Sequence, residues 1–239
     1  LNLEEITVSG MKLGELIDGK ETLNQDIIRS LDNPIYKEGS LAVLKGNLAP
    51  DGCVIKPAAC DKKFLKHRGP AIVFDSYPDM KKIIDSDELD VTENHVLVLR
   101  NVGPVGGPGM PEWGMMPIPK KLLKKGVRDM VRISDARMSG TSYGACILHV
   151  APESYVGGPL SLLETGDIIE INVELRSINM LVDEKTLLQR KKKVKKNNSK
   201  AGRGWLWMYS NHVRQANEGC DFDFLESDFG ISAKEPDIF

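Results

Sequence analysis

Short apolar segments separated by turn-forming residues recur along this chain of 239 residues and leave little room for long helices. The clearest buried strand is predicted at residues 95–100, where His95 precedes four apolar residues. Further strands or apolar elements are expected at 41–44, 53–56, 69–74, 129–133, 145–150, 167–175 and 177–182. Many short strands with regular turn signals favour a barrel or sandwich with attached helices over a doubly wound sheet.

Four helices and a basic run complete the predicted elements. Helices are expected at 15–28, 77–84 and 119–125, after a hairpin-like start at 6–14. The basic run from Arg190 to Asn198 is interpreted as a solvated linker or helix end, since it stands alone in a balanced chain. We expect one domain at 1–190, a basic linker at 191–204, and a C-terminal helix and tail at 205–239 that pack on the same domain.

The composition excludes several classes of protein. A net charge of −2 gives no reason to expect nucleic acid or an anionic membrane as partner. No apolar run approaches the ~20 residues that span a bilayer, and the first residues do not resemble a signal peptide. Because the sequence does not begin with Met, we expect it to start inside a longer reading frame or to have been cut.

Four scattered cysteines are expected to be free thiols in a reducing cytoplasm. Cys53 and Cys60 are too far apart for a CxxC redox motif or zinc knuckle, and no His lies between them. With Cys146 and Cys220 they form no set tight enough for a complete iron–sulfur site.

The first loop that can carry chemistry follows the strand at 95–100. Residues 103–109 contain so much Gly and Pro that regular structure is excluded. Such a loop allows close backbone approach to a ligand and offers unpaired N–H groups to anions, but it matches neither a P-loop nor a dinucleotide-binding motif. Glu112 at its end suits a hard cation such as Mg²⁺. An exposed turn glutamate without function remains the alternative.

The second loop, residues 134–144, combines hydroxyls, a carboxylate and a guanidinium between two apolar elements. Ser139 followed by Gly140 resembles half of a nucleophile elbow, but the flanking glycines of that motif are missing. Hydrolysis by a Ser/His/Asp triad is therefore weakly supported, and a turn that caps the next element is the alternative.

Residues 101–112 and 134–144 closely resemble two motifs of the dihydroxy-acid dehydratase / phosphogluconate dehydratase family. Further stretches resemble that family's C-terminal domain in the same order: 46–52, 149–153 and 157–160. The second loop reads Ser134-Asp135-Ala136-Arg137-Met138-Ser139-Gly140-Thr141, whereas the branched-chain enzymes typically have Asp-Gly-Arg-Phe-Ser-Gly-Gly-Thr there. Together with the tail at 209–225, this loop is similar to the pentonate branch (arabinonate, xylonate).

This resemblance implies a mixed α/β fold, a small β-barrel flanked by helices like the swivelling domain of aconitase-like enzymes, which closes over the active site. It implies a hydro-lyase that converts an aldonic (2,3-dihydroxy) acid to a 2-keto-3-deoxy acid through an enol. The implied cofactors are Mg²⁺, which binds the substrate carboxylate and 2-hydroxyl, and a [2Fe–2S] cluster, which acts on the leaving 3-hydroxyl. A homo-oligomer is also implied.

Carried over residue by residue, the resemblance makes Ser139 the base that removes the C2 proton and Glu112 a Mg²⁺ ligand. Arg137 and Thr141 are predicted to bind substrate, with a structural ion pair as the alternative for Arg137. The family's cluster cysteines, its other Mg²⁺ ligands and a modified lysine belong to an N-terminal domain that this sequence does not cover. The chain alone is therefore expected to be inactive.

Two other functions stay open from the sequence. The substrate could instead be a branched dihydroxy acid of branched-chain amino-acid synthesis. The chain could also be a free-standing binding domain without chemistry.

Overall fold

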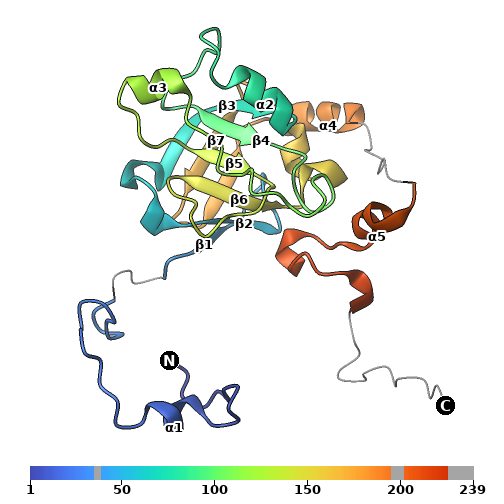
Figure 1. Cartoon of the computed structure of the whole chain (residues 1–239). Coiled ribbons are helices and arrows are strands. Elements are labelled where there is room, and N and C mark those ends of the chain that lie inside the picture. The colour runs from blue at the N-terminus through green and yellow to red at the C-terminus, as the bar shows by residue number, and fades with distance from the viewer. Residues whose placement is uncertain (35–38, 195–201, 226–239) are drawn as a thin grey trace, which may run out of the picture. The chain divides into compact units, whose positions relative to one another are not determined.

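Eight strands of the described residues form one sheet that curves into a nearly closed barrel (Figure 1). The computed structural model describes residues 1–34, 39–194 and 202–225. The strands are β1 Ala42–Leu44, β2 Gly52–Ile55, β3 Lys66–Phe74, β4 Val96–Leu99, β5 Arg132–Ser134, β6 Cys146–Ala151, β7 Ile168–Asn172 and β8 Ser177–Met180. Their order in the sheet is β1-β2-β6-β5-β4-β3-β7-β8. The series β6-β5-β4-β3 is parallel, and the other pairs are antiparallel.

Backbone contacts join the two edges of the sheet where β1 ends and β8 begins. The Lys45 N–H donates to the Arg176 carbonyl at 2.9 Å, and the Ile178 N–H donates to the Lys45 carbonyl at 3.1 Å. The Asn47 side chain continues this seam, because it donates to the Met180 carbonyl at 2.9 Å and accepts the Met180 N–H at 2.7 Å. Joining the edges satisfies backbone groups that an open sheet exposes. The predicted mixed α/β fold with a small barrel is confirmed.

The hydrophobic core lies within this sheet, and β4 runs through its middle. All four residues of β4 are buried, as expected for a strand covered on both faces. Large apolar side chains of the neighbouring strands complete the core, among them Leu44, Ile55, Ile133, Ile147 and Ile169.

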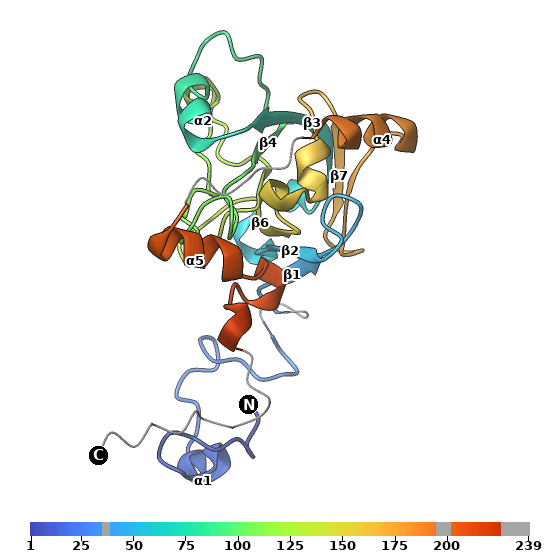
Figure 2. The same ribbon diagram turned by 90° about the vertical axis from the view of Figure 1, so that its right-hand side faces the viewer.

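The helices of the larger unit lie outside the sheet (Figure 2). They are α2 Tyr77–Ile83, α3 Lys120–Lys124, α4 Glu184–Lys193 and α5 Gly204–His212, with short 3₁₀ turns η1 Pro57–Ala59, η2 Lys62–Phe64, η3 Ser154–Val156, η4 Pro159–Leu162, η5 Ala216–Glu218 and η6 Asp223–Leu225. The Ser76 hydroxyl accepts the Asp79 N–H at 3.2 Å and so begins α2 where the sequence predicts it. None of the described helices is both long and apolar enough to cross a membrane.

The basic run from Arg190 begins as part of a packed helix. Arg190 in α4 donates to the Asp167 carboxylate at 3.0 Å and to the Leu162 carbonyl at 3.0 Å. The helix continues to Lys193, so the first part of the run is a helix end rather than a free linker. Residues 195–201, in the predicted linker, and 226–239, in the predicted tail, lie outside the described residues.

Residues 1–39 form a unit of their own, separate from the unit that begins at residue 40. Ile6 and Lys12 form an antiparallel bridge, in agreement with the hairpin-like start. The helix predicted at 15–28 is wrong: α1 spans only Leu13–Ile17. Gly19 adopts a left-handed φ of +66°, which ends a helix. None of residues 1–34 is buried, so no core stabilises a longer helix.

Candidate active site

Both candidate loops leave the same edge of the barrel. Strands β4 and β5 are parallel neighbours, and Leu99 at the end of one pairs with Ser134 at the end of the other. The loops that follow them therefore start side by side. Strand β6 runs parallel to β5, so the segment after Ala151 emerges at this edge as well. Functional side chains commonly gather at the carboxyl ends of parallel strands.

The buried carboxylate of Asp135 ties these three strand ends together. It accepts the N–H groups of Asn101 at 3.2 Å, Val102 at 3.0 Å and Ser154 at 2.9 Å, and also the Ser154 hydroxyl at 2.5 Å. Burial raises the pKa of Asp135, while the four donors oppose that shift. Asp135 is thus a structural member of the second loop, since every oxygen contact is internal.

Glu153 holds the glycine-rich loop in the same manner. Its carboxylate accepts the N–H groups of Val105 at 2.8 Å and Gly106 at 2.9 Å, and the Gln215 amide at 2.9 Å. A Cβ at Gly103 would lie 2.6 Å from this carboxylate, which explains a glycine there. The expectation that the loop offers unpaired N–H groups to anions is therefore wrong for these two amides. Burial raises the pKa of Glu153, while these donors lower it.

Glu112 and Arg137 connect the tips of the two loops. The Nη2 atom of Arg137 donates to Oε1 of Glu112 at 2.8 Å, and both side chains are about half exposed. The structure thus contains the ion pair that was the alternative for Arg137, whereas its role toward substrate stays a prediction. An ion pair this exposed contributes at most about 1 kcal/mol to stability.

Ser139 and Thr141 lie together on the second loop. The Thr141 N–H donates to Ser139 Oγ at 3.2 Å, and the two hydroxyl oxygens are 3.0 Å apart. The Ser142 hydroxyl accepts the Ser139 N–H at 3.2 Å, which fixes the backbone at the serine. The serine oxygen therefore faces a backbone donor and a second hydroxyl, both from Thr141.

His149 supports the loop just before Ser139. Its Nε2 accepts the Met138 N–H at 2.8 Å, which requires a neutral ring with that nitrogen unprotonated. Burial lowers the pKa of His149, and the Arg137 charge lowers it further. The residue adopts a left-handed φ of +57°, so the backbone of β6 bends here.

Glu112 fits a magnesium site as one oxygen ligand. A loop carboxylate is a ligand type that Mg²⁺ accepts, and Mg²⁺ takes few ligands from protein. Across 1–34, 39–194 and 202–225, no three or more His, Cys, Asp or Glu side chains are grouped to hold a metal ion. The described residues therefore do not by themselves form a complete magnesium site around Glu112.

The described cysteines do not fit an iron–sulfur cluster. All four are free and none is grouped with other ligands. Burial raises the pKa of Cys53 to about 12 and that of Cys146 to about 11, which disfavours the thiolate that binds iron.

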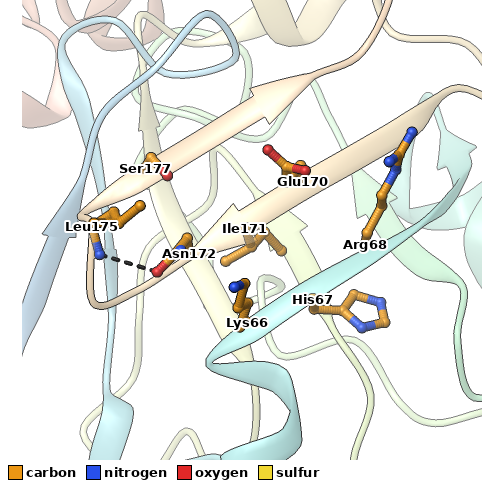
Figure 3. Close-up of a pocket in the computed structure, with 8 residues that line it drawn as sticks. All are labelled: Lys66, His67, Arg68, Glu170, Ile171, Asn172, Leu175 and Ser177. Atoms are coloured by element: carbon orange, nitrogen blue, oxygen red, sulfur yellow. Dashed lines mark hydrogen bonds between the residues drawn. The ribbon is translucent and has the colours of Figure 1, made fainter.

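A hollow of about 360 Å³ lies over β3 and β7, away from the candidate loops (Figure 3). In the register of these strands, Lys66 lies opposite Asn172 and Arg68 lies opposite Glu170. None of its lining residues belongs to either loop.

Sequence reasoning missed Lys56, His149 and Glu153 as supports of the loops. Lys56 reaches the carbonyl oxygens of the Ser139 loop from the end of β2. His149 and Glu153 stand in a stretch that carries the family resemblance, which was the one signal available.

Comparison with known proteins tests the family resemblance. Residues 26–220 match the family described as dihydroxy-acid/6-phosphogluconate dehydratase, C-terminal. A 6-deoxy-6-sulfo-D-gluconate dehydratase of Pseudomonas putida is 49% identical over 241 aligned positions, which cover 100% of this chain and 41% of the relative. An L-arabonate dehydratase of Azospirillum brasilense is 44% identical, covering 94% of this chain and 40% of the relative.

A dihydroxy-acid dehydratase of Methanococcus aeolicus is 40% identical over 90% of this chain and 38% of its own length. The chain thus spans about two fifths of the length of these relatives. The family resemblance of the sequence motifs is confirmed.

Proposed function

Because the chain belongs to the dihydroxy-acid/6-phosphogluconate dehydratase family, we propose that it forms one side of the active site of a hydro-lyase. The proposed reaction removes water from an aldonic acid, a 2,3-dihydroxy acid, to give a 2-keto-3-deoxy acid. The observation that carries this proposal is the meeting of Glu112 and Arg137 from two loops at one barrel edge, with Ser139 two residues beyond Arg137. The remaining length of the relatives would supply the other side.

Ser139 is proposed as the base that takes the proton from C2 of the substrate. A serine hydroxyl is a weak base at neutral pH and needs neighbouring donors or positive charge to lose its proton. The Thr141 N–H already faces Ser139 Oγ at 3.2 Å, and the Thr141 hydroxyl at 3.0 Å can turn its proton toward it. Both donors favour the deprotonated serine, and Arg137 adds positive charge nearby.

Glu112 is proposed to hold Mg²⁺ through one carboxylate oxygen. When bound, Mg²⁺ supplies a Lewis acid that polarises substrate oxygens and stabilises negative charge. Arg137, now paired with Glu112 at 2.8 Å, would then be free to bind the substrate carboxylate. We place the [2Fe–2S] cluster outside this chain, since the described cysteines do not fit it.

We further propose that the protein acts as a homo-oligomer in the cytoplasm. The free thiols support a reducing compartment. Of the proposed domain at 1–190, linker at 191–204 and C-terminal part at 205–239, the unit that begins at residue 40 would close over the substrate.

A branched dihydroxy acid is the second candidate substrate. Dihydroxy-acid dehydratases of Methanococcus aeolicus and Clostridium beijerinckii are 40% and 42% identical to this chain. The sugar-acid dehydratases at 49% and 44% favour an aldonic acid instead. Assaying the full-length protein against arabinonate, xylonate, gluconate and dihydroxyisovalerate decides between them.

The serine is tested by Ser139→Ala in the full-length protein. We expect the rate to fall by at least about 10²-fold, the usual minimum for a lost general base. Ser86→Ala is the matched control, because Ser86 is partly exposed, lies outside the two loops and also accepts a backbone N–H two residues later, from Glu88. A Ser139→Ala enzyme that keeps more than about a hundredth of the rate refutes the proposed base.

The metal role is tested by Glu112→Gln, measured as Mg²⁺ affinity by calorimetry rather than as turnover. The amide keeps the size of the side chain but removes its charge, so Mg²⁺ should bind more weakly. Glu88→Gln serves as control, and unchanged affinity in Glu112→Gln would refute the assignment.

A further inference from the structure

Lys56 lies directly after β2, and its side chain reaches the loop that carries Ser139. Its ammonium donates to the carbonyl oxygens of Ser139 at 2.8 Å and Gly140 at 3.0 Å, and the Ser142 carbonyl lies at 3.5 Å. An ammonium has three donors and no acceptor, so three carbonyls match it. This part of the loop belongs to no helix or strand, and Lys56 provides partners that a sheet would otherwise supply.

The geometry of the peptide carries this contact to the serine hydroxyl. In a trans peptide, a carbonyl and the N–H of the next residue point in opposite directions. With the Gly140 carbonyl on Lys56, the Thr141 N–H points away from Lys56 and donates to Ser139 Oγ at 3.2 Å. One peptide thus has the Lys56 ammonium at its negative end and the Ser139 oxygen at its positive end.

We propose that Lys56 is a positioning residue for Ser139. It orients the peptide between Gly140 and Thr141 so that the Thr141 N–H stabilises the deprotonated serine. The inference rests on the proposed function, in which Ser139 is the base. Among the described residues, the hydrogen bonds of Lys56 go to backbone oxygens of this loop, so the proposed effect of Lys56 passes through the loop.

The surroundings of Lys56 allow a chemical test. Together with Ser40, Leu41, Ala58 and Ala59 it lines a hollow of about 400 Å³. After truncation of Lys56 to Ala, a small alkylammonium ion has room to enter and to donate to the same carbonyls. If such an ion restores activity, the missing element is a cation that donates hydrogen bonds at this position, and not the packing of the lysine side chain.

The experiment uses the full-length protein and measures kcat and KM separately. Lys56→Met should lower kcat on the order of 10²-fold, the size typical of a misplaced catalytic group, with KM changed less than about threefold. Lys56→Arg should have a kcat at least about a tenth of that of the original enzyme, since it keeps a cation that can donate to the carbonyls. The kcat of Lys56→Ala should rise when ethylammonium is added. Lys66→Met, on the outer face of β3, is the matched control and should keep the original kcat.

A double variant separates the two proposals. If Lys56 acts through Ser139, Lys56→Met combined with Ser139→Ala should be no slower than Ser139→Ala alone. An active Lys56→Met enzyme beside an inactive Ser139→Ala enzyme overturns the inference but leaves the proposed base intact. An active Ser139→Ala enzyme overturns the base itself. A change in KM alone, no response of folded Lys56→Ala to ethylammonium, or unfolding of both the Met and Ala variants also overturns the positioning role.

Discussion

Replacing Asp135 with Asn tests whether one buried carboxylate holds three strand ends in place. The two side chains have nearly the same shape, so packing changes little. Asp135 accepts three donors at Oδ2, two from Ser154 and one from Asn101, and one donor at Oδ1, from Val102. Asn keeps one acceptor oxygen and turns the other position into a donor.

The loss of stability expected for Asp135→Asn follows from the number of donors at each carboxylate oxygen. With the amide oxygen at the Oδ2 position, the new NH₂ group faces the Val102 N–H, which now donates to Oδ1 at 3.0 Å. A buried N–H without an acceptor costs about 1–3 kcal/mol. Removing the charge weakens the remaining hydrogen bonds but relieves the burial of an ion, and these two effects oppose each other. We expect the free energy of unfolding to fall by about 2 kcal/mol.

The assay is thermal unfolding of the full-length protein, combined with hydrogen exchange of the peptide that spans Asn101 and Val102. A loss of about 2 kcal/mol corresponds to a Tm lowered by roughly 4–8 °C in a unit of this size. Exchange at Val102 should rise most. The exposed Asp51→Asn variant controls for the change in net charge. A Tm shift below about 1 °C would refute the reasoning.

Three further predictions concern the supports of the loops. Burial gives His149 a lower pKa in the folded protein than in the unfolded chain, so as pH falls below about 6.5 the unfolded chain takes up the proton first and the folded protein loses stability. In urea unfolding between pH 5 and 7, the free energy of unfolding of His149→Gln should therefore fall less with acid than that of the original protein. An equal pH dependence of the two free energies would contradict this. Gln215→Ala removes both hydrogen bonds between that side chain and Glu153, so limited proteolysis within 202–225 should accelerate; an unchanged cleavage rate speaks against it. Gly103→Ala places a Cβ 2.6 Å from the Glu153 carboxylate and should destabilise by about 1–3 kcal/mol in urea unfolding, whereas Gly140→Ala, with no atom within 4 Å of its Cβ, should not.

The individual strands could be predicted from sequence because they carry strong local signals, whereas the choice of a barrel over a sandwich came from the family resemblance. The short run of apolar residues at 96–99, bounded by turn-forming residues, indicates a buried strand, and the structure has one there. The failed helix at 15–28 had a helical period but no core to bury its apolar face, which a local pattern cannot reveal. Strand order and closure through Lys45 depend on contacts between distant segments, so periodicity alone did not give them.

The candidate site could be predicted only in its loop residues. Ser139 and Glu112 stand in motifs that family resemblance picks out, although their chemistry remains a proposal. Lys56 comes from a strand end 83 residues before Ser139, and no spacing rule links two such positions. Glu153 was likewise hidden, because an acidic residue after a strand is usually exposed and here is buried on backbone donors.

The internal anchoring of the glycine-rich loop by Glu153 has a consequence for how such a site changes over evolution. The backbone shape of the loop is fixed by a residue of its own domain before any ligand arrives, so binding does not have to order it. In the proposed enzyme, new substrate preferences could then arise by exchanging side chains at the loop tips while the backbone beneath them stays the same. A mutation at Glu153 would instead remove the acceptor that holds this backbone.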